Sequence, residues 1–212
     1  MQRPDPVRAV VFDFDGLLAD TEKPWGVAER SMFTSRGVPY GDTERALFLG
    51  TAVETTAAIM ADYFDEPQPR VLADLLARAR DELAAGSEPM PGAVDLLGRL
   101  RVPFAVASNT PRDLLDLSLA ASGLGELVPV SVSASEVAAS KPAPDVYLRA
   151  CELLGVRPAT TVGIEDSRTG AAAARAAGMY VVMVPSGPCD PDDADFLGAS
   201  LSDPGLLELL GL

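Results

Sequence analysis

The chain has 212 residues, of which 48% are hydrophobic and 23% charged, as is ordinary for a globular protein with a packed core. Its 17 basic and 31 acidic residues give a net charge of −14, which disfavours nucleic acid and an anionic membrane surface as partners. The complete absence of histidine excludes a Ser-His-Asp hydrolase and any zinc site built on histidine.

Short valine-rich apolar runs recur along the chain, with helical patterns between them. The first run, residues 7–12, is almost continuously apolar and predicts a strand that is buried on both faces. Similar runs predict strands over 102–107, 128–132, 161–164 and 180–184. Alternating strands and helices are typical of an α/β fold, so we expect a Rossmann-like parallel sheet with helices on both faces.

The helical patterns between these strands carry end signals. Helices are predicted over 91–100, 111–121, 143–154 and 169–177. We interpret Thr110-Pro111 as an N-cap followed by proline at the first helical position.

One long segment after the first strand contains no convincing strand. Its helical patterns cover residues 27–35, 52–63 and 71–84, and it ends in a Pro/Gly-rich run over 86–92. We therefore predict a helical cap over residues 17–90, inserted into an α/β core of residues 1–16 and 91–212. Opening and closing of this cap is expected, with hinges at 17–20 and 86–92.

Polar residues gather where the predicted strands end. Asp13-Phe14-Asp15-Gly16 closes the first strand, and residues two apart in an extended chain point the same way. Gly16 permits a sharp turn and a close approach to a ligand. Taken singly, this motif is more typical of a turn followed by a helix cap.

Three further motifs follow in chain order. Ser108-Asn109 can hold phosphate oxygens or act as a helix cap, Lys141 can hold a phosphoryl group or be a surface charge, and Glu165-Asp166 can bind Mg²⁺ or cap a helix. Because the tips of parallel strands converge on one sheet edge, the four motifs together predict a phosphoryl-transfer site.

These motifs together resemble the haloacid dehalogenase superfamily, in its phosphatase and β-phosphoglucomutase-like branch with a helical cap. The resemblance spans nearly the whole chain and includes Glu165-Asp166-Ser167-Arg168-Thr169-Gly170. It implies a Mg²⁺-dependent phosphatase that acts on a small phosphorylated metabolite, with a sugar or polyol phosphate as the expected class.

The resemblance also implies a role for each motif residue. Asp13 would be the nucleophile that forms an aspartyl-phosphate, and Asp15 the general acid and base. Asp13, Asp166 and the backbone carbonyl of Asp15 would hold Mg²⁺, with Glu165 in support. The phosphate-binding residues would be Gly16, Ser108, Asn109 and Lys141.

Two rival functions stay open on the sequence. A phosphomutase is disfavoured because the chain has no histidine and because residues 48–54 lack the expected arginine or lysine. A non-catalytic protein that binds a phosphorylated metabolite is disfavoured by the intact acidic set. The two cysteines and the absence of a signal peptide or a long apolar run lead us to expect a cytoplasmic location. The pattern does not determine the oligomeric state.

Overall fold

The larger part of the molecule is built around a parallel β-sheet. The computed structural model describes residues 3–48, 51–187 and 189–212. Within these ranges the strand order is β3-β2-β1-β4-β5-β6, and every neighbouring pair is parallel. The strands are β1 (Ala9–Phe12), β2 (Phe104–Ser108), β3 (Ser131–Ser133), β4 (Thr161–Glu165), β5 (Tyr180–Met183) and β6 (Phe196–Leu197).

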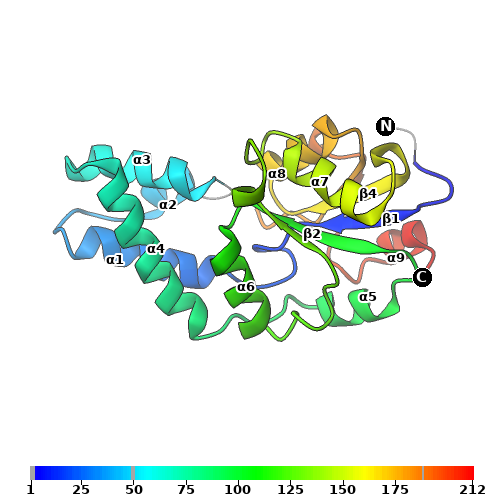
Figure 1. Cartoon of the computed structure of the whole chain (residues 1–212), viewed down its shortest axis with the longest axis horizontal. Helices are drawn as coiled ribbons and strands as arrows, with labels where there is room; N and C mark the ends of the chain where they lie inside the picture. The colour runs from blue at the N-terminus through cyan, green and yellow to red at the C-terminus, as the bar shows by residue number, and fades with distance from the viewer. Residues whose placement is uncertain (1–2, 49–50, 188) are drawn as a thin grey trace.

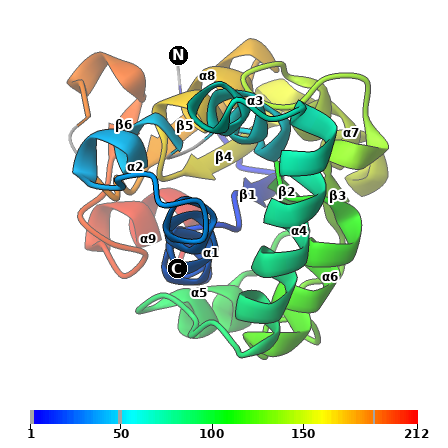
Figure 2. The same ribbon diagram turned by 90° about the vertical axis from the view of Figure 1, so that its left-hand side faces the viewer.

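Some helices alternate with the strands along the chain and pack on the sheet, and others form a separate lobe at one end of the sheet (Figures 1 and 2). Those of the lobe are α1 (Glu22–Thr34), α2 (Asp42–Phe48), α3 (Val53–Phe64) and α4 (Gln68–Ala84). Those that accompany the sheet are α5 (Ala93–Arg99), α6 (Arg112–Ala121), α7 (Asp145–Leu154), α8 (Arg168–Ala176) and α9 (Pro204–Leu210). Each helix of the described ranges is too short or too polar to span a lipid bilayer.

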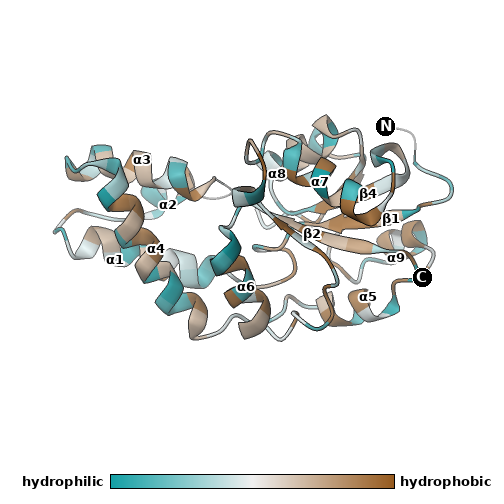
Figure 3. Ribbon diagram, viewed as in Figure 1, coloured by the Kyte–Doolittle hydropathy of each residue, from teal (hydrophilic) through white to brown (hydrophobic). Residues whose placement is uncertain are grey.

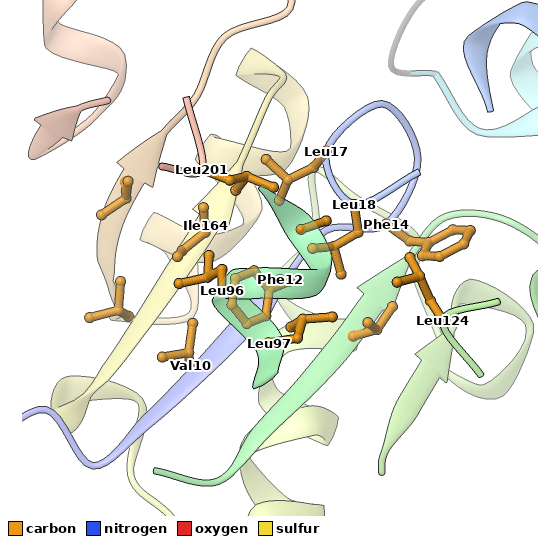
Figure 4. Close-up of a cluster of buried hydrophobic side chains, with 14 of the residues drawn as sticks. Val10, Phe12, Phe14, Leu17, Leu18, Leu96, Leu97, Leu124, Ile164 and Leu201 are labelled. Atoms are coloured by element: carbon orange, nitrogen blue, oxygen red, sulfur yellow. The ribbon is translucent and has the colours of Figure 1, made fainter. Parts of the chain in front are cut away.

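Both faces of the sheet are buried, as the continuous apolar runs predict. Val10 and Phe12 point to one face and pack with α5 and α9, in the cluster drawn in Figure 4. Val11 points to the other face and packs with α7 and α8. The hydropathy colouring of Figure 3 shows β1 and β2 on the hydrophobic side of its scale. The expected α/β sheet with helices on both faces is therefore confirmed.

The lobe of α1 to α4 has a hydrophobic core of its own. Met32, Phe33, Met60 and Leu75 are fully buried in it. Leu114 of α6 belongs to the same cluster, so the sheet domain also contributes to the packing of the lobe. The helical nature of this segment is confirmed, whereas the proposed domain limits at residues 17 and 90 remain a prediction.

The two connections between the lobe and the sheet lie against each other. The amide of Asp20 donates to the carbonyl of Glu88 at 2.9 Å, and the amide of Met90 donates to that of Leu18 at 2.8 Å. The predicted hinges are thus paired segments rather than independent linkers. Their motion remains a prediction.

Several elements differ from the expectations. The sequence analysis did not predict α2, α9 or β6. The interpretation of Thr110 as an N-cap was wrong: Pro111 occupies the N-cap position of α6, and the Thr110 hydroxyl bonds to Asp15 instead. Because Pro111 takes the N-cap position, the helix begins one residue later than the interpretation of Thr110 requires, and no side-chain hydrogen bond caps it.

Candidate active site

The carboxyl ends of the central strands deliver the predicted residues to one place. Asp13 directly follows β1, Ser108 ends β2 and Glu165 ends β4. The amide of Asp13 donates to the carbonyl of Ile164 at 2.9 Å, which continues the β1–β4 pairing to the site. A cavity of about 490 Å³ lies between this sheet edge and the lobe, and Asp13, Asp15, Lys141 and Asp166 line it on the sheet side.

A buried ion-pair network connects Lys141 to two of the predicted carboxylates. Its Nζ donates to Oδ1 of Asp13 and to Oε1 of Glu165, both at 2.6 Å. The Lys141 side chain is only 4% exposed, although an unpaired lysine is normally solvated. Tyr147 on α7 also donates its hydroxyl to Glu165. Lys141 is therefore a buried lysine of the cavity that joins Asp13 to Glu165, and its phosphate-binding role remains a prediction.

A cluster of negative charge surrounds this one ammonium group. Oxygen atoms of Asp13, Glu165 and Asp166 lie within 4.8 Å of one another, and all three residues are buried. Burial and the charge of Glu165 raise the pKa of Asp13 well above its usual value and the pKa of Asp166 to about 7. Burial opposes the charge on Lys141, but Asp13 and Glu165 outweigh it and raise its pKa.

This donor set fits a divalent cation that prefers oxygen. Three buried carboxylates repel one another, and Lys141 neutralises only part of their charge. Mg²⁺ takes carboxylate oxygens together with waters, so Asp13 and Asp166, which line the cavity, are suitable ligands. Asp15 is expected to contribute its backbone carbonyl rather than its carboxylate, and this remains a prediction.

Three hydroxyl groups fix the carboxylate of Asp15. Thr21 donates to its Oδ1 at 2.8 Å, while Ser108 and Thr110 donate to its Oδ2 at 2.6 and 2.9 Å. Asp15 lines the cavity beside Asp13, as the spacing of two residues predicts. Ser108, predicted to bind phosphate, is fully buried, and in this structure its hydroxyl donates to the carboxylate of Asp15.

Asn109 acts on the backbone of Lys141. Its Oδ1 accepts the Lys141 amide at 2.8 Å, and its Nδ2 donates to the Lys141 carbonyl at 3.3 Å. This two-point contact fixes the loop that carries the lysine. Asn109 also lines the cavity, so contact with a bound phosphate remains available to it as predicted.

Two glycines allow the carboxylates to approach the backbone. A Cβ atom on Gly16 would lie 2.7 Å from Oδ2 of Asp166, and its φ of 78° also favours glycine. Gly16 is thus needed for packing against Asp166, while its predicted phosphate contact stays a prediction. At Gly170 a Cβ atom would overlap the carboxylate of Glu165.

We expect Gly170→Ala to disturb the site through Glu165. The methyl group must displace the carboxylate that holds Lys141, so the free energy of unfolding should fall by about 1–3 kcal/mol and turnover should fall with it. Denaturant titration measures the first effect. Gly98→Ala is the matched control, because a Cβ there meets nothing within 4 Å. Equal stability of the two variants would contradict the prediction.

Sequence reasoning missed Thr110 and Tyr147 as members of the site. Thr110 was assigned to helix capping, and Tyr147 was absorbed into an apolar helix pattern. The hydroxyl of Tyr147 could have indicated its role, because a tyrosine on the buried face of a helix needs a hydrogen-bond partner. Here that partner is Glu165.

The lobe supplies the opposite side of the cavity, which we call the cap wall: Glu22, Trp25, Glu29, Arg45, Phe48 and Thr56. Arg45 lies just before the stretch 48–54 that lacks a cation; Leu49 and Gly50 of that stretch lie outside the described residues. The cap wall therefore contains one arginine, which the motif comparison overlooked. Trp25 both lines the cavity and packs on the hydrophobic core of the lobe.

Comparison with known proteins places the chain in a family. Residues 7–178 match the haloacid dehalogenase-like hydrolases. Protein CbbY of Rhodobacter capsulatus is 35% identical over 195 residues, covering 85% of this chain and 86% of that protein. Hexitol phosphatase B of Escherichia coli is 32% identical over 219 residues, covering 99% and 97%. The crystal structure of CbbY from Rhodobacter sphaeroides in complex with phosphate has a TM-score of 0.83 and 28% identity, covering 97% of this chain and all of that one (100%).

Proposed function

The chain belongs to the haloacid dehalogenase-like hydrolases, and we propose that it is a Mg²⁺-dependent phosphatase that hydrolyses a small phosphate monoester through an aspartyl-phosphate. The observation that supports this most is that Asp13, Lys141 and Asp166 line the same cavity, on its sheet side. A nucleophile, a cation and a set of oxygen ligands are the parts that phosphoryl transfer requires.

Asp13 is the proposed nucleophile. One of its carboxylate oxygens attacks phosphorus, and the bond between phosphorus and the ester oxygen breaks. Lys141, which already contacts Oδ1, offsets negative charge on the phosphoryl oxygens as they approach. Asp13, Asp166 and the Asp15 carbonyl would hold Mg²⁺, which when bound supplies further charge neutralisation to the phosphoryl group.

Asp15 is the proposed acid and base. It gives a proton to the departing alcohol oxygen, and later takes a proton from the water that attacks the phosphorus of the aspartyl-phosphate. That second step releases inorganic phosphate and restores the Asp13 carboxylate. The hydroxyls of Thr21, Ser108 and Thr110 orient Asp15 for both transfers.

A sugar or polyol phosphate is the proposed substrate class, in a cytoplasmic setting. Hexitol phosphatase B is among the relatives that span nearly the whole chain, and a cavity of about 490 Å³ is large enough for such an ester. A mutase would retain the phosphoryl group and return an isomeric ester, and the absence of histidine still disfavours it. A non-catalytic binder would bind the ester without turnover.

The proposal is tested by phosphate release from a panel of esters with Mg²⁺ and with a chelator. We expect turnover with Mg²⁺, a loss of about 100-fold or more on chelation, and full recovery when Mg²⁺ is returned, because the carboxylate cluster needs a counter-charge. Conversion to an isomeric ester without phosphate release would favour the mutase. Metal-independent turnover would contradict the role of Mg²⁺.

A further inference from the structure

The cations around the cavity are already paired with acids. Among the described lining residues these cations are Arg45, Lys141 and Arg168. Lys141 bonds to Asp13 and Glu165, whereas Nη2 of Arg45 lies 4.0 Å from Oε2 of Glu22. The Nε atom of Arg168 lies 2.9 Å from Asp193. A second anionic group on a substrate would therefore have to compete with a protein carboxylate for each of them.

Glu29 is an acid of the cap wall that forms no ion pair with any of these three cations. It is 8% exposed and lines the cavity from α1. The Tyr40 hydroxyl donates to its Oε2 at 3.0 Å, and in the described part of the chain no donor is bound to Oε1. The guanidinium carbon of Arg30 lies over the Tyr40 ring, 5.1 Å from its centroid. One carboxylate oxygen is thus fixed while the other is available to a ligand.

The rest of the cap wall suits a compact hydroxyl-bearing group. Trp25 and Phe48 provide apolar surface, and Thr56 shares a hydrogen bond of 2.7 Å with Thr51 through their hydroxyls. A carboxylate in such surroundings binds hydroxyl donors strongly, since hydrogen bonds to a charged group are about twice as strong as neutral ones. The same carboxylate repels a ligand carboxylate or phosphate.

We propose that Glu29, oriented by Tyr40, selects the alcohol part of the ester: it favours a neutral, hydroxyl-rich leaving group and disfavours one that carries a carboxylate or a second phosphate. This inference rests on the proposed phosphatase function and deepens it. Burial raises the pKa of Glu29 to about 7, so an assay at pH 8 keeps most of this group ionised.

The test compares kcat/KM at pH 8 with Mg²⁺ for four kinds of ester. These are hexitol 6-phosphates, phosphoglycolate, fructose 1,6-bisphosphate, and p-nitrophenyl phosphate as a reference without hydroxyl groups. For the native protein we expect the best hexitol ester to exceed phosphoglycolate and the bisphosphate by roughly tenfold or more. In Glu29→Gln the ratio of hexitol ester to p-nitrophenyl phosphate should fall by roughly tenfold.

Two further variants make the result specific. Glu54→Gln is the matched control, because Glu54 is exposed on α3 and outside the cavity, and its ratio should stay that of the native protein. Tyr40→Phe should move the ratio in the same direction as Glu29→Gln, by a smaller factor. Equal ratios in Glu29→Gln and Glu54→Gln, or a native preference for phosphoglycolate or the bisphosphate, would overturn the inference while leaving the phosphatase proposal intact. No turnover of any ester would overturn both.

Discussion

Asp13→Asn is expected to abolish phosphate release, with a fall in kcat of about 10⁴-fold or more. An amide has no anionic oxygen to attack phosphorus, and Asn cannot form the acyl-phosphate. The substitution is nearly isosteric, so the Lys141 ammonium can still donate to the remaining carbonyl oxygen in place of Oδ1. Phosphate release under saturating Mg²⁺ measures the effect, and circular dichroism verifies the fold.

The matched control for this change is Asp95→Asn on α5. The Asp95 side chain is 67% exposed, and its ion-pair partner in the part of the chain that the structure describes is Arg99 on the same helix. It should keep native turnover, since surface ion pairs contribute little to stability. If Asp13→Asn kept a tenth of the native rate, the nucleophile would have to be a different residue. Mass spectrometry of native protein quenched during turnover should detect the phosphorylated Asp13.

The sheet was predictable because its strands are buried on both faces. Such strands appear in the sequence as continuous apolar runs, and residues 7–12 and 180–184 contain the whole of β1 and of β5. The two residues of β6 lie in an acidic loop and form no run that periodicity could detect. Helix α1 begins at Glu22, earlier than predicted, because the charged and proline-containing start of the helix hides its periodicity.

The sequence predicts which strand ends carry the acidic residues of the site. It does not predict which side chains contact one another there. Parallel strands place their carboxyl ends along one edge of the sheet, so the sequence predicts that Asp13 and Glu165 share that edge. Their direct proximity follows from the pairing of β1 with β4, which the structure shows. That Ser108 bonds to Asp15, while Tyr147 supports Glu165, depends on side-chain packing across distant segments. The spacing of residues along one strand or helix cannot predict such contacts.

Lys141→Met is expected to reduce both stability and turnover, for a single electrostatic reason. The side chain is 4% exposed and is the ion-pair partner of Asp13 and Glu165. Removing one partner of a buried ion pair costs about 3–5 kcal/mol, because the remaining charges are left uncompensated. We expect this loss in the free energy of unfolding without Mg²⁺, and a fall in kcat/KM of about 10³-fold.

The chain provides an unusually clean control, because its only other lysine is Lys23. That side chain is 81% exposed and pairs with Asp20 at the surface, so Lys23→Met should change stability by less than about 0.5 kcal/mol. Mg²⁺ should then restore more stability to Lys141→Met than to Lys23→Met, because the carboxylates of Asp13, Glu165 and Asp166 lack a counter-charge only in the former. Equal denaturation midpoints for the two variants without Mg²⁺ would mean that the buried acids are neutralised by protonation, and that Lys141 serves catalysis without holding the site together.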